Sequence, residues 1–200
     1  GADRDSELIM GFNKDTDKSE YLTALHNHTL PVLLNTEKVE KGDCFFIPAG
    51  TVHAICKGCY IAEIQQTSDI TYRIYDYDRR DKNGNPGGLH TELATDVINF
   101  CEQKQHSIHY HQHENHTEEL VSCNYFTTNY LKFDKEVEKD YIELDSFVIY
   151  MCLEGNFTLV YDVDKTVKVN KGETILVPAI LKNLFLIPET EAEILEIYIR

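Results

Sequence analysis

The chain has 200 residues, which is long enough to bury a core of its own without disulfides or a structural metal. Its 34 Asp and Glu residues against 19 Lys and Arg residues give a net charge of −15. Such a charge repels phosphate backbones and anionic bilayers, and no apolar run approaches the roughly 20 residues of a membrane helix, so nucleic-acid and membrane partners are disfavoured.

The first forty residues carry the main helical pattern of the front half. Thr16–Glu20 is typical of a helix cap followed by an acidic first turn, and an apolar face follows over 21–25. Pro31 then permits only a short second helix. The sequence therefore predicts helices within 16–35.

The pattern then changes to short runs of β-branched and aromatic residues, which predict strands over 44–47, 60–66 and 70–75. A polar loop rich in Gly, Asn and Pro follows at 78–90, and one more helix is expected over 92–101. The remainder alternates short strands and turns. The expected fold class is all-β with a few helices.

One nine-residue segment occurs twice. Residues 41–49 are KGDCFFIPA and residues 171–179 are KGETILVPA. Each copy has a Gly turn, a strand and a Pro that cannot donate to a neighbouring ladder. A strand, Gly turn and strand over 153–159 precede the second copy, as in a double-sheet barrel. We find no equivalent before the first copy, so we expect a complete carboxy-terminal barrel at 105–200 and a partial first unit at 1–104.

The pattern K-G-D/E-x-x-x-I/V-P-A after a strand, Gly turn and strand resembles the cupin, or jelly-roll, superfamily. More narrowly, P-A-G-T-V-H-A at 48–54 and Q-Q-T-S-D-I-T-Y-R-I-Y-D at 65–76 resemble the small bacterial form of type I mannose-6-phosphate isomerase. The resemblance extends from Leu8 to the carboxy-terminal barrel. It implies a zinc-dependent aldose–ketose isomerase that interconverts mannose 6-phosphate and fructose 6-phosphate.

The same resemblance implies which residues form the site. His53 matches the His ligand of P-A-G-T-V-H, whereas the family's Gln, second His and Glu zinc ligands have no match in this chain. The sequence is therefore expected to lack the family's amino-terminal part and to be inactive alone. Arg73 matches an arginine implicated in catalysis near the sugar phosphate. The general base is not identified.

The residues themselves leave these roles open. His53 follows a Gly-containing turn, where an imidazole can face a barrel mouth or merely complete the rim, and zinc normally needs three or more protein ligands. Strand alternation would place Arg73 on one face with Thr71 and Tyr75. There its guanidinium could meet a sugar phosphate or pair with an acid such as Glu63.

Two other groups contain potential metal ligands. His109, His111 and His113 would share one face of a strand and could chelate a transition metal; the alternative, which we favour, is a solvated linker strand. Cys56 and Cys59 form a lone C-x-x-C without the second pair of a zinc ribbon, so no function is expected there.

Two functions remain open: the isomerase, or a non-catalytic bicupin that binds a sugar phosphate or acts as an assembly module. Asn183 occupies the position of His53 in the second copy, so the carboxy-terminal barrel is expected to hold no metal. Unpaired strand edges of the first unit would be covered by folding against the carboxy-terminal barrel, with the 16–35 helices as a lid, or, as we expect, by a second chain in a homodimer. A reducing cytoplasm is the expected compartment.

Overall fold

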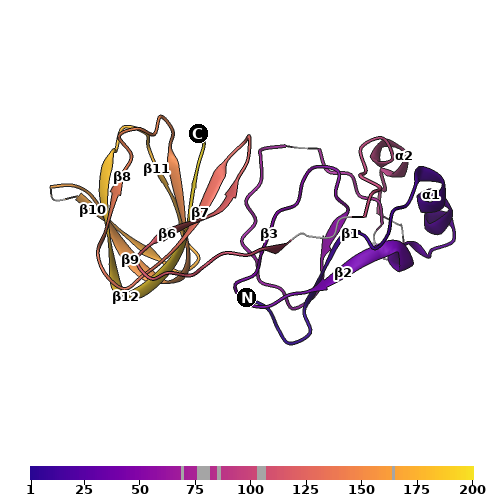
Figure 1. Ribbon diagram of the computed structural model, residues 1–200, viewed down its shortest axis with the longest axis horizontal. Helices are drawn as coiled ribbons and strands as arrows, with labels where there is room; N and C mark the ends of the chain where they lie inside the picture. The colour runs from indigo at the N-terminus through magenta and orange to yellow at the C-terminus, as the bar shows by residue number, and fades with distance from the viewer. Residues whose placement is uncertain (69, 76–81, 85–86, 103–106, 164) are drawn as a thin grey trace. The chain divides into compact units, whose positions relative to one another are not determined.

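The computed structural model describes residues 1–68, 70–75, 82–84, 87–102, 107–163 and 165–200 (Figure 1). The described residues form two compact units, Gly1–Ile108 and His109–Arg200, each with its own apolar core. Strands predominate in the second unit, whereas the first unit combines short strands with short helices. Among these residues no helix has the length and apolar character that crossing a membrane requires.

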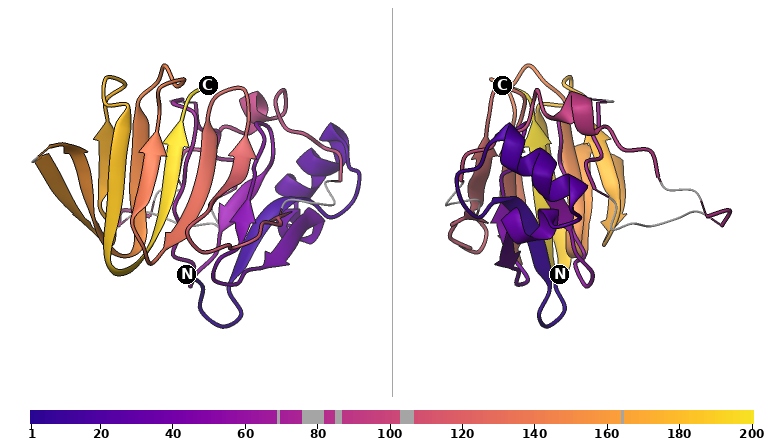
Figure 2. Two further views of the ribbon diagram at one scale, coloured as in Figure 1. Left: turned by 60° about the vertical axis from the view of Figure 1, so that its left-hand side comes forward. Right: turned by 90° about the vertical axis from the view of Figure 1, so that its right-hand side faces the viewer.

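The second unit is built on two long antiparallel strands, β9 (Val148–Asp162) and β12 (Asn183–Tyr198). Within the part described, five shorter strands complete a seven-stranded sheet: β6 (Thr117–Ser122), β7 (Thr127–Phe133), β8 (Val137–Asp140), β10 (Lys165–Asn170) and β11 (Thr174–Val177). β8 and β7 pair with opposite ends of β12, and β11 and β10 pair with opposite ends of β9. The two ends of each long strand thus belong to the two opposite faces of a jelly roll (Figure 2), which confirms the expected architecture.

Both long strands change register at the same level. The pairing shifts between Pro188 and Ala192 in β12, and Ala192 lies opposite Gly155 in β9. Gly155 has a φ of 71°, and a Cβ there would lie 2.0 Å from the carbonyl oxygen of Glu191. Glycine is therefore required where the strands bend and approach each other most closely.

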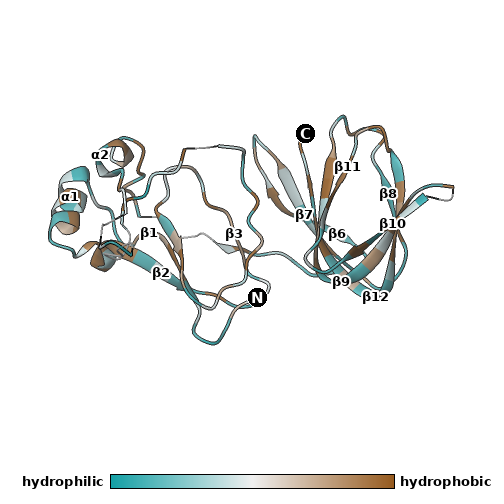
Figure 3. Ribbon diagram, turned by 180° about the vertical axis from the view of Figure 1, so that it is seen from behind, coloured by the Kyte–Doolittle hydropathy of each residue, from teal (hydrophilic) through white to brown (hydrophobic). Residues whose placement is uncertain are grey.

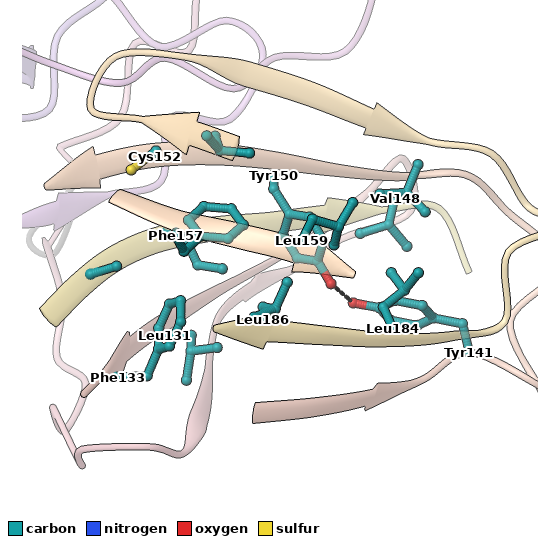
Figure 4. Close-up of a cluster of buried hydrophobic side chains, with 14 residues drawn as sticks. Leu131, Phe133, Tyr141, Val148, Tyr150, Cys152, Phe157, Leu159, Leu184 and Leu186 are labelled. Atoms are coloured by element: carbon teal, nitrogen blue, oxygen red, sulfur yellow. Dashed lines mark hydrogen bonds between the residues drawn. The ribbon is translucent and has the colours of Figure 1, made fainter. Parts of the chain in front are cut away.

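Aromatic and aliphatic side chains fill the barrel (Figure 4). Phe157 meets Phe133 and Tyr150 edge-on, with ring centroids 5.9 and 6.3 Å apart, the arrangement that aromatic quadrupoles favour. The hydroxyls of Tyr141 and Tyr150 are hydrogen-bonded to each other inside this core. The core is thus apolar except where polar groups partner one another.

One carboxylate lies in this core. Glu196 is 2% exposed. It accepts hydrogen bonds from the Tyr141 hydroxyl and from Asn129 Nδ2 at 2.9 Å, and it forms an ion pair with Lys139 Nζ at 3.0 Å. Burial, with the neighbouring Tyr150 and Glu196, raises the pKa of Tyr141, so its phenol stays protonated and donates. Both carboxylate oxygens have partners, which is the condition for burying a charge.

The first unit contains a sheet in the order β2 (Leu34–Lys38), β1 (Glu7–Phe12), β4 (His53–Ile55), and a short pair, β3 (Cys44–Phe45) and β5 (Ser107–Ile108). β2 lies at the edge of its sheet in the described residues and is mostly polar (Figure 3), as exposed edges usually are.

The helices of the first unit occur between these strands along the chain. They are α1 (Lys18–His26), the 3-10 helix η1 (Leu30–Leu33) and α2 (Thr91–Ala94). Asp17 caps α1 by accepting from the Glu20 N–H at 2.8 Å, which confirms a helix start in the predicted place. Tyr21 of α1 is fully buried and packs against Phe100, with ring centroids 5.7 Å apart. The helical insert therefore contributes to the core of its own unit.

The two copies of the repeated segment begin with the same turn. Gly42 and Gly172 have φ values of 98° and 83°. The acidic side chains that follow, Asp43 and Glu173, each accept from the backbone N–H three residues earlier, at 2.8 and 2.7 Å. The repeat is therefore structural as well as sequential.

The expectation that no strand corresponds to 153–159 in the first unit was wrong for the strand that follows the Gly turn. β1 pairs with both β2 and β4, as β9 pairs with both β10 and β12. In the second unit β10 begins three residues after β9 ends, whereas the residues between β1 and β2 include α1 and η1. This insertion separates the paired strands in sequence and hid their equivalence.

Three predicted elements of the first unit were wrong. Residues 60–66 and 70–75 are all described, and none of them is in a strand. Several of their apolar side chains, such as those of Tyr60 and Ile70, are exposed; a β pattern becomes a strand only where another strand supplies hydrogen-bond partners. The helix expected over 92–101 is limited to α2. There the Thr95 hydroxyl donates to the Glu92 carbonyl at 2.7 Å and competes with the backbone hydrogen bonds that would continue the helix.

Candidate functional site

His53 is the first residue of β4, opposite Met10 of β1. Its Nδ1 lies 3.0 Å from the carbonyl oxygen of Thr51. Because a carbonyl oxygen can only accept, this contact selects the tautomer with the hydrogen on Nδ1. The Nε2 lone pair of the exposed ring is then free for a metal or a proton, the arrangement seen when a second group orients a ligand histidine.

The loop that carries His53 is packed against the chain that follows α2. Gly50 has a φ of 87°, and its carbonyl accepts from the Asn99 N–H at 2.9 Å. A Cβ at Gly50 would lie 2.5 Å from the Val97 carbonyl oxygen. The glycine of P-A-G-T-V-H is therefore required both by its left-handed backbone and by this close approach.

We expect Gly50→Ala to destabilise the first unit by about 3 kcal/mol, because it adds backbone strain to a clash with another backbone. Hydrogen exchange at the Asn99 amide, measured by NMR, should accelerate most. Gly58→Ala is the matched control: its φ is 84°, but the nearest atom to its added Cβ is the rotatable Ser6 hydroxyl, at 2.6 Å. Equal acceleration at Asn99 in both variants would contradict a specific role for Gly50.

Arg73 lies in a segment without regular secondary structure, and its side chain is exposed. The next two residues, Ile74 and Tyr75, pack against the core around Phe12 and Tyr21. The Arg73 backbone is bonded to His90: the His90 N–H donates to the Arg73 carbonyl at 2.8 Å, and the Arg73 N–H donates to His90 Nδ1 at 3.2 Å. The guanidinium is thus carried by an anchored backbone.

The described residues fit a zinc site only in part. Among them, no group of three or more His, Cys, Asp or Glu side chains is arranged to hold a metal ion. His53 supplies one donor, fewer than the three protein ligands that zinc normally requires. No catalytic step through zinc follows from these residues.

The histidine-rich segment does not form the chelating face considered above. Residues 109–113 are not in a strand. The His111 and His113 rings are 5.7 Å apart, and His113 Nδ1 lies 2.6 Å from the Glu118 carboxylate. The histidines of this segment are exposed, as the solvated alternative expected, but the segment is not the linker strand that this alternative assumed.

The remaining candidates for metal ligands are the C-x-x-C cysteines and the second copy's counterpart of His53. Cys56 and Cys59 are free thiols. Burial, with the nearby Glu7 carboxylate and Cys59, raises the pKa of Cys56 and disfavours the thiolate that metal binding needs. Asn183 begins β12 as His53 begins β4, so the second unit carries an amide where the first carries an imidazole.

One residue of this region was missed from the sequence. His90 ends a polar loop rich in Gly and Pro and resembles an ordinary solvated histidine. Its bond to the Arg73 backbone spans 17 positions, and no local pattern announces such a contact. The segment from His90 to Asn99 thus contacts the backbones near both candidate site residues.

Comparison with known proteins gives a consistent result, although no family model matches the chain. Mannose-6-phosphate isomerase ManA of Bacillus subtilis is 34% identical over 177 residues, which are 88% of this chain and 55% of that protein. The crystal structure of a mannose 6-phosphate isomerase from Bacillus subtilis has a TM-score of 0.87 at 30% identity, covering 99% of this chain and 62% of the other.

More distant structures agree on the fold. A phosphomannose isomerase from Salmonella typhimurium has a TM-score of 0.68 at 13% identity, over 96% of this chain and 63% of the other. The chain spans about half the length of the curated relatives that it matches, with 54% and 55% of two of them covered.

Proposed function

The chain belongs to the mannose-6-phosphate isomerase family, and from this premise we propose that it supplies the part of such an isomerase that binds the sugar phosphate. The similarity to a mannose 6-phosphate isomerase over 99% of the chain carries the proposal. Mannose 6-phosphate and fructose 6-phosphate are the substrate and product that it implies. Both are anions that an exposed guanidinium can bind.

Arg73 is the residue that we assign to the substrate. Aldose–ketose isomerisation moves a proton between C1 and C2, and negative charge develops on the sugar oxygens as the enediol forms. Guanidinium donors held near these oxygens, or near the phosphate, stabilise that charge. The anchored backbone of Arg73 limits the motion that would weaken such contacts.

His53 is the residue that we assign to a metal. Its Nδ1 contact with Thr51 leaves Nε2 as the donor atom. Because one donor does not hold zinc, this assignment requires ligands beyond the described residues. The chain alone is therefore expected to bind a sugar phosphate but not to turn it over.

A non-catalytic sugar-phosphate module is the second candidate, and the lack of a donor trio among the described residues favours it. Both candidates predict binding, and only the isomerase predicts that His53 matters for turnover when the remaining ligands are supplied. Binding is consequently the first property to measure.

We expect calorimetric titration with fructose 6-phosphate to detect binding, and Arg73→Gln to weaken it at least tenfold through loss of a charged hydrogen-bond donor. Arg200→Gln is the matched control, because Arg200 is also exposed but lies in the second unit and pairs with Glu119 at 2.7 Å. Absence of binding at millimolar ligand, or equal effects of both variants, would overturn the proposal.

A coupled assay of the same chain with mannose 6-phosphate and added zinc should show no turnover. A rate within a hundredfold of the roughly 10 per second typical of enzymes would contradict this expectation.

A further inference from the structure

The backbone of Arg73 has both of its polar groups bonded to one residue. The His90 N–H donates to the Arg73 carbonyl at 2.8 Å, and the Arg73 N–H donates to His90 Nδ1 at 3.2 Å. The imidazole nitrogen takes the place that a carbonyl oxygen occupies in an ordinary β-bridge. The ring centroids of Tyr72 and His90 are 6.2 Å apart. His90 therefore fixes the direction of the backbone at Arg73.

His90 is itself held firmly. It is the N-cap of α2, and its carbonyl accepts from the Ala94 N–H at 2.9 Å. Ala94 is fully buried, so the turn behind His90 is anchored in the unit. On the other side, Ile74 and Tyr75 anchor the chain that leaves Arg73. The Arg73 backbone is thus held by His90 through hydrogen bonds and by the packing of the two residues that follow it.

The contact sets a chemical requirement on His90. An N–H group can donate only to a nitrogen that carries a lone pair, so Nδ1 must be unprotonated and the ring hydrogen must be on Nε2. A residue without an acceptor at this position would leave the Arg73 N–H without this partner. The guanidinium would then start from a less defined backbone.

We infer that His90 is a positioning residue for Arg73, an inference that rests on the proposed role of Arg73 in sugar-phosphate binding. His90 does not touch the substrate. Its Nδ1 orients the backbone from which the guanidinium reaches the anion, and it lowers the entropy lost on binding. The chain that follows His90 also holds the loop at Gly50, since the Asn99 N–H donates to the Gly50 carbonyl at 2.9 Å.

Two variants test this inference. His90→Phe keeps a planar ring but removes the acceptor, whereas His90→Asn keeps an acceptor oxygen near the place of Nδ1. In His90→Phe we expect hydrogen exchange of the Arg73 amide to accelerate about tenfold, and the dissociation constant for fructose 6-phosphate to rise about fivefold. In His90→Asn both values should return to within about twofold of the wild type. The Asn99 amide should exchange normally in both variants, which shows that the unit remains folded.

Each result has a clear meaning. Faster exchange at Arg73 with unchanged affinity would overturn the positioning role, and so would weaker binding with unchanged exchange. Failure of His90→Asn to restore either value would show that the acceptor atom is not what matters. If the wild-type chain binds no sugar phosphate, the proposed function fails, while the exchange data still decide whether His90 holds Arg73.

Discussion

Replacing Glu196 by leucine is expected to lower the free energy of unfolding of the second unit by about 3 to 5 kcal/mol. The substitution leaves the Lys139 ammonium, whose side chain is 9% exposed, without its counter-charge. It also removes the acceptor of the Tyr141 hydroxyl and of the Asn129 amide. Urea denaturation followed by circular dichroism, with hydrogen exchange of the β9 amides, measures the loss.

Two comparisons make this result specific. Glu119→Leu removes a carboxylate from the same unit, but that group is exposed and pairs with Arg200 near the surface, so little change is expected. The double variant Glu196→Leu, Lys139→Met should recover at least half of the loss, because apolar replacement of a complete buried pair is often nearly neutral. A double variant as unstable as Glu196→Leu would show that the unpaired charge is not the cause.

Gly155→Ala is expected to destabilise the second unit by about 4 kcal/mol, a loss that few single substitutions reach. Its φ of 71° already disfavours any Cβ, and the added carbon would lie 2.0 Å from the Glu191 carbonyl oxygen. Both groups belong to backbones of paired strands, so neither can rotate away, and β9 and β12 would have to separate at the bend. The same denaturation and exchange measurements report this change.

Gly172→Ala separates strain from the clash. Gly172 has a φ of 83°, and an added Cβ would meet no heavy atom within 4 Å. Its loss should therefore be limited to the left-handed backbone, about 1 to 2 kcal/mol. If both variants lost the same stability, the close approach of β9 and β12 would not be what requires Gly155.

The sequence predicted what depends on local chemistry. The positive φ values of Gly42 and Gly172, with their capping acids, follow from the K-G-D/E pattern of each copy. The helix start at Asp17 follows from the residues around it. Family membership was also accessible, because long strings such as P-A-G-T-V-H-A combine many such local requirements. His53 and Arg73 were singled out through those strings.

Features that depend on distant partners were decided by the tertiary structure. Residues 60–66 and 70–75 have strand-like composition, yet no strand ladder forms there in the described chain. β1 was overlooked because its partner β2 lies beyond a helical insertion, and pairing across such a distance leaves no periodic trace.

Dependence on distant partners also explains why the roles of Glu196 and His90 could not be predicted from the sequence. A glutamate on a strand is usually exposed, and Glu196 can be buried because Asn129 on β7, Lys139 on β8 and the Tyr141 hydroxyl are its partners. His90 is inconspicuous until the fold brings it to Arg73. A sequence specifies the chemistry that each residue can perform, whereas the partners with which it does so are set by contacts between distant segments that form only when the chain packs.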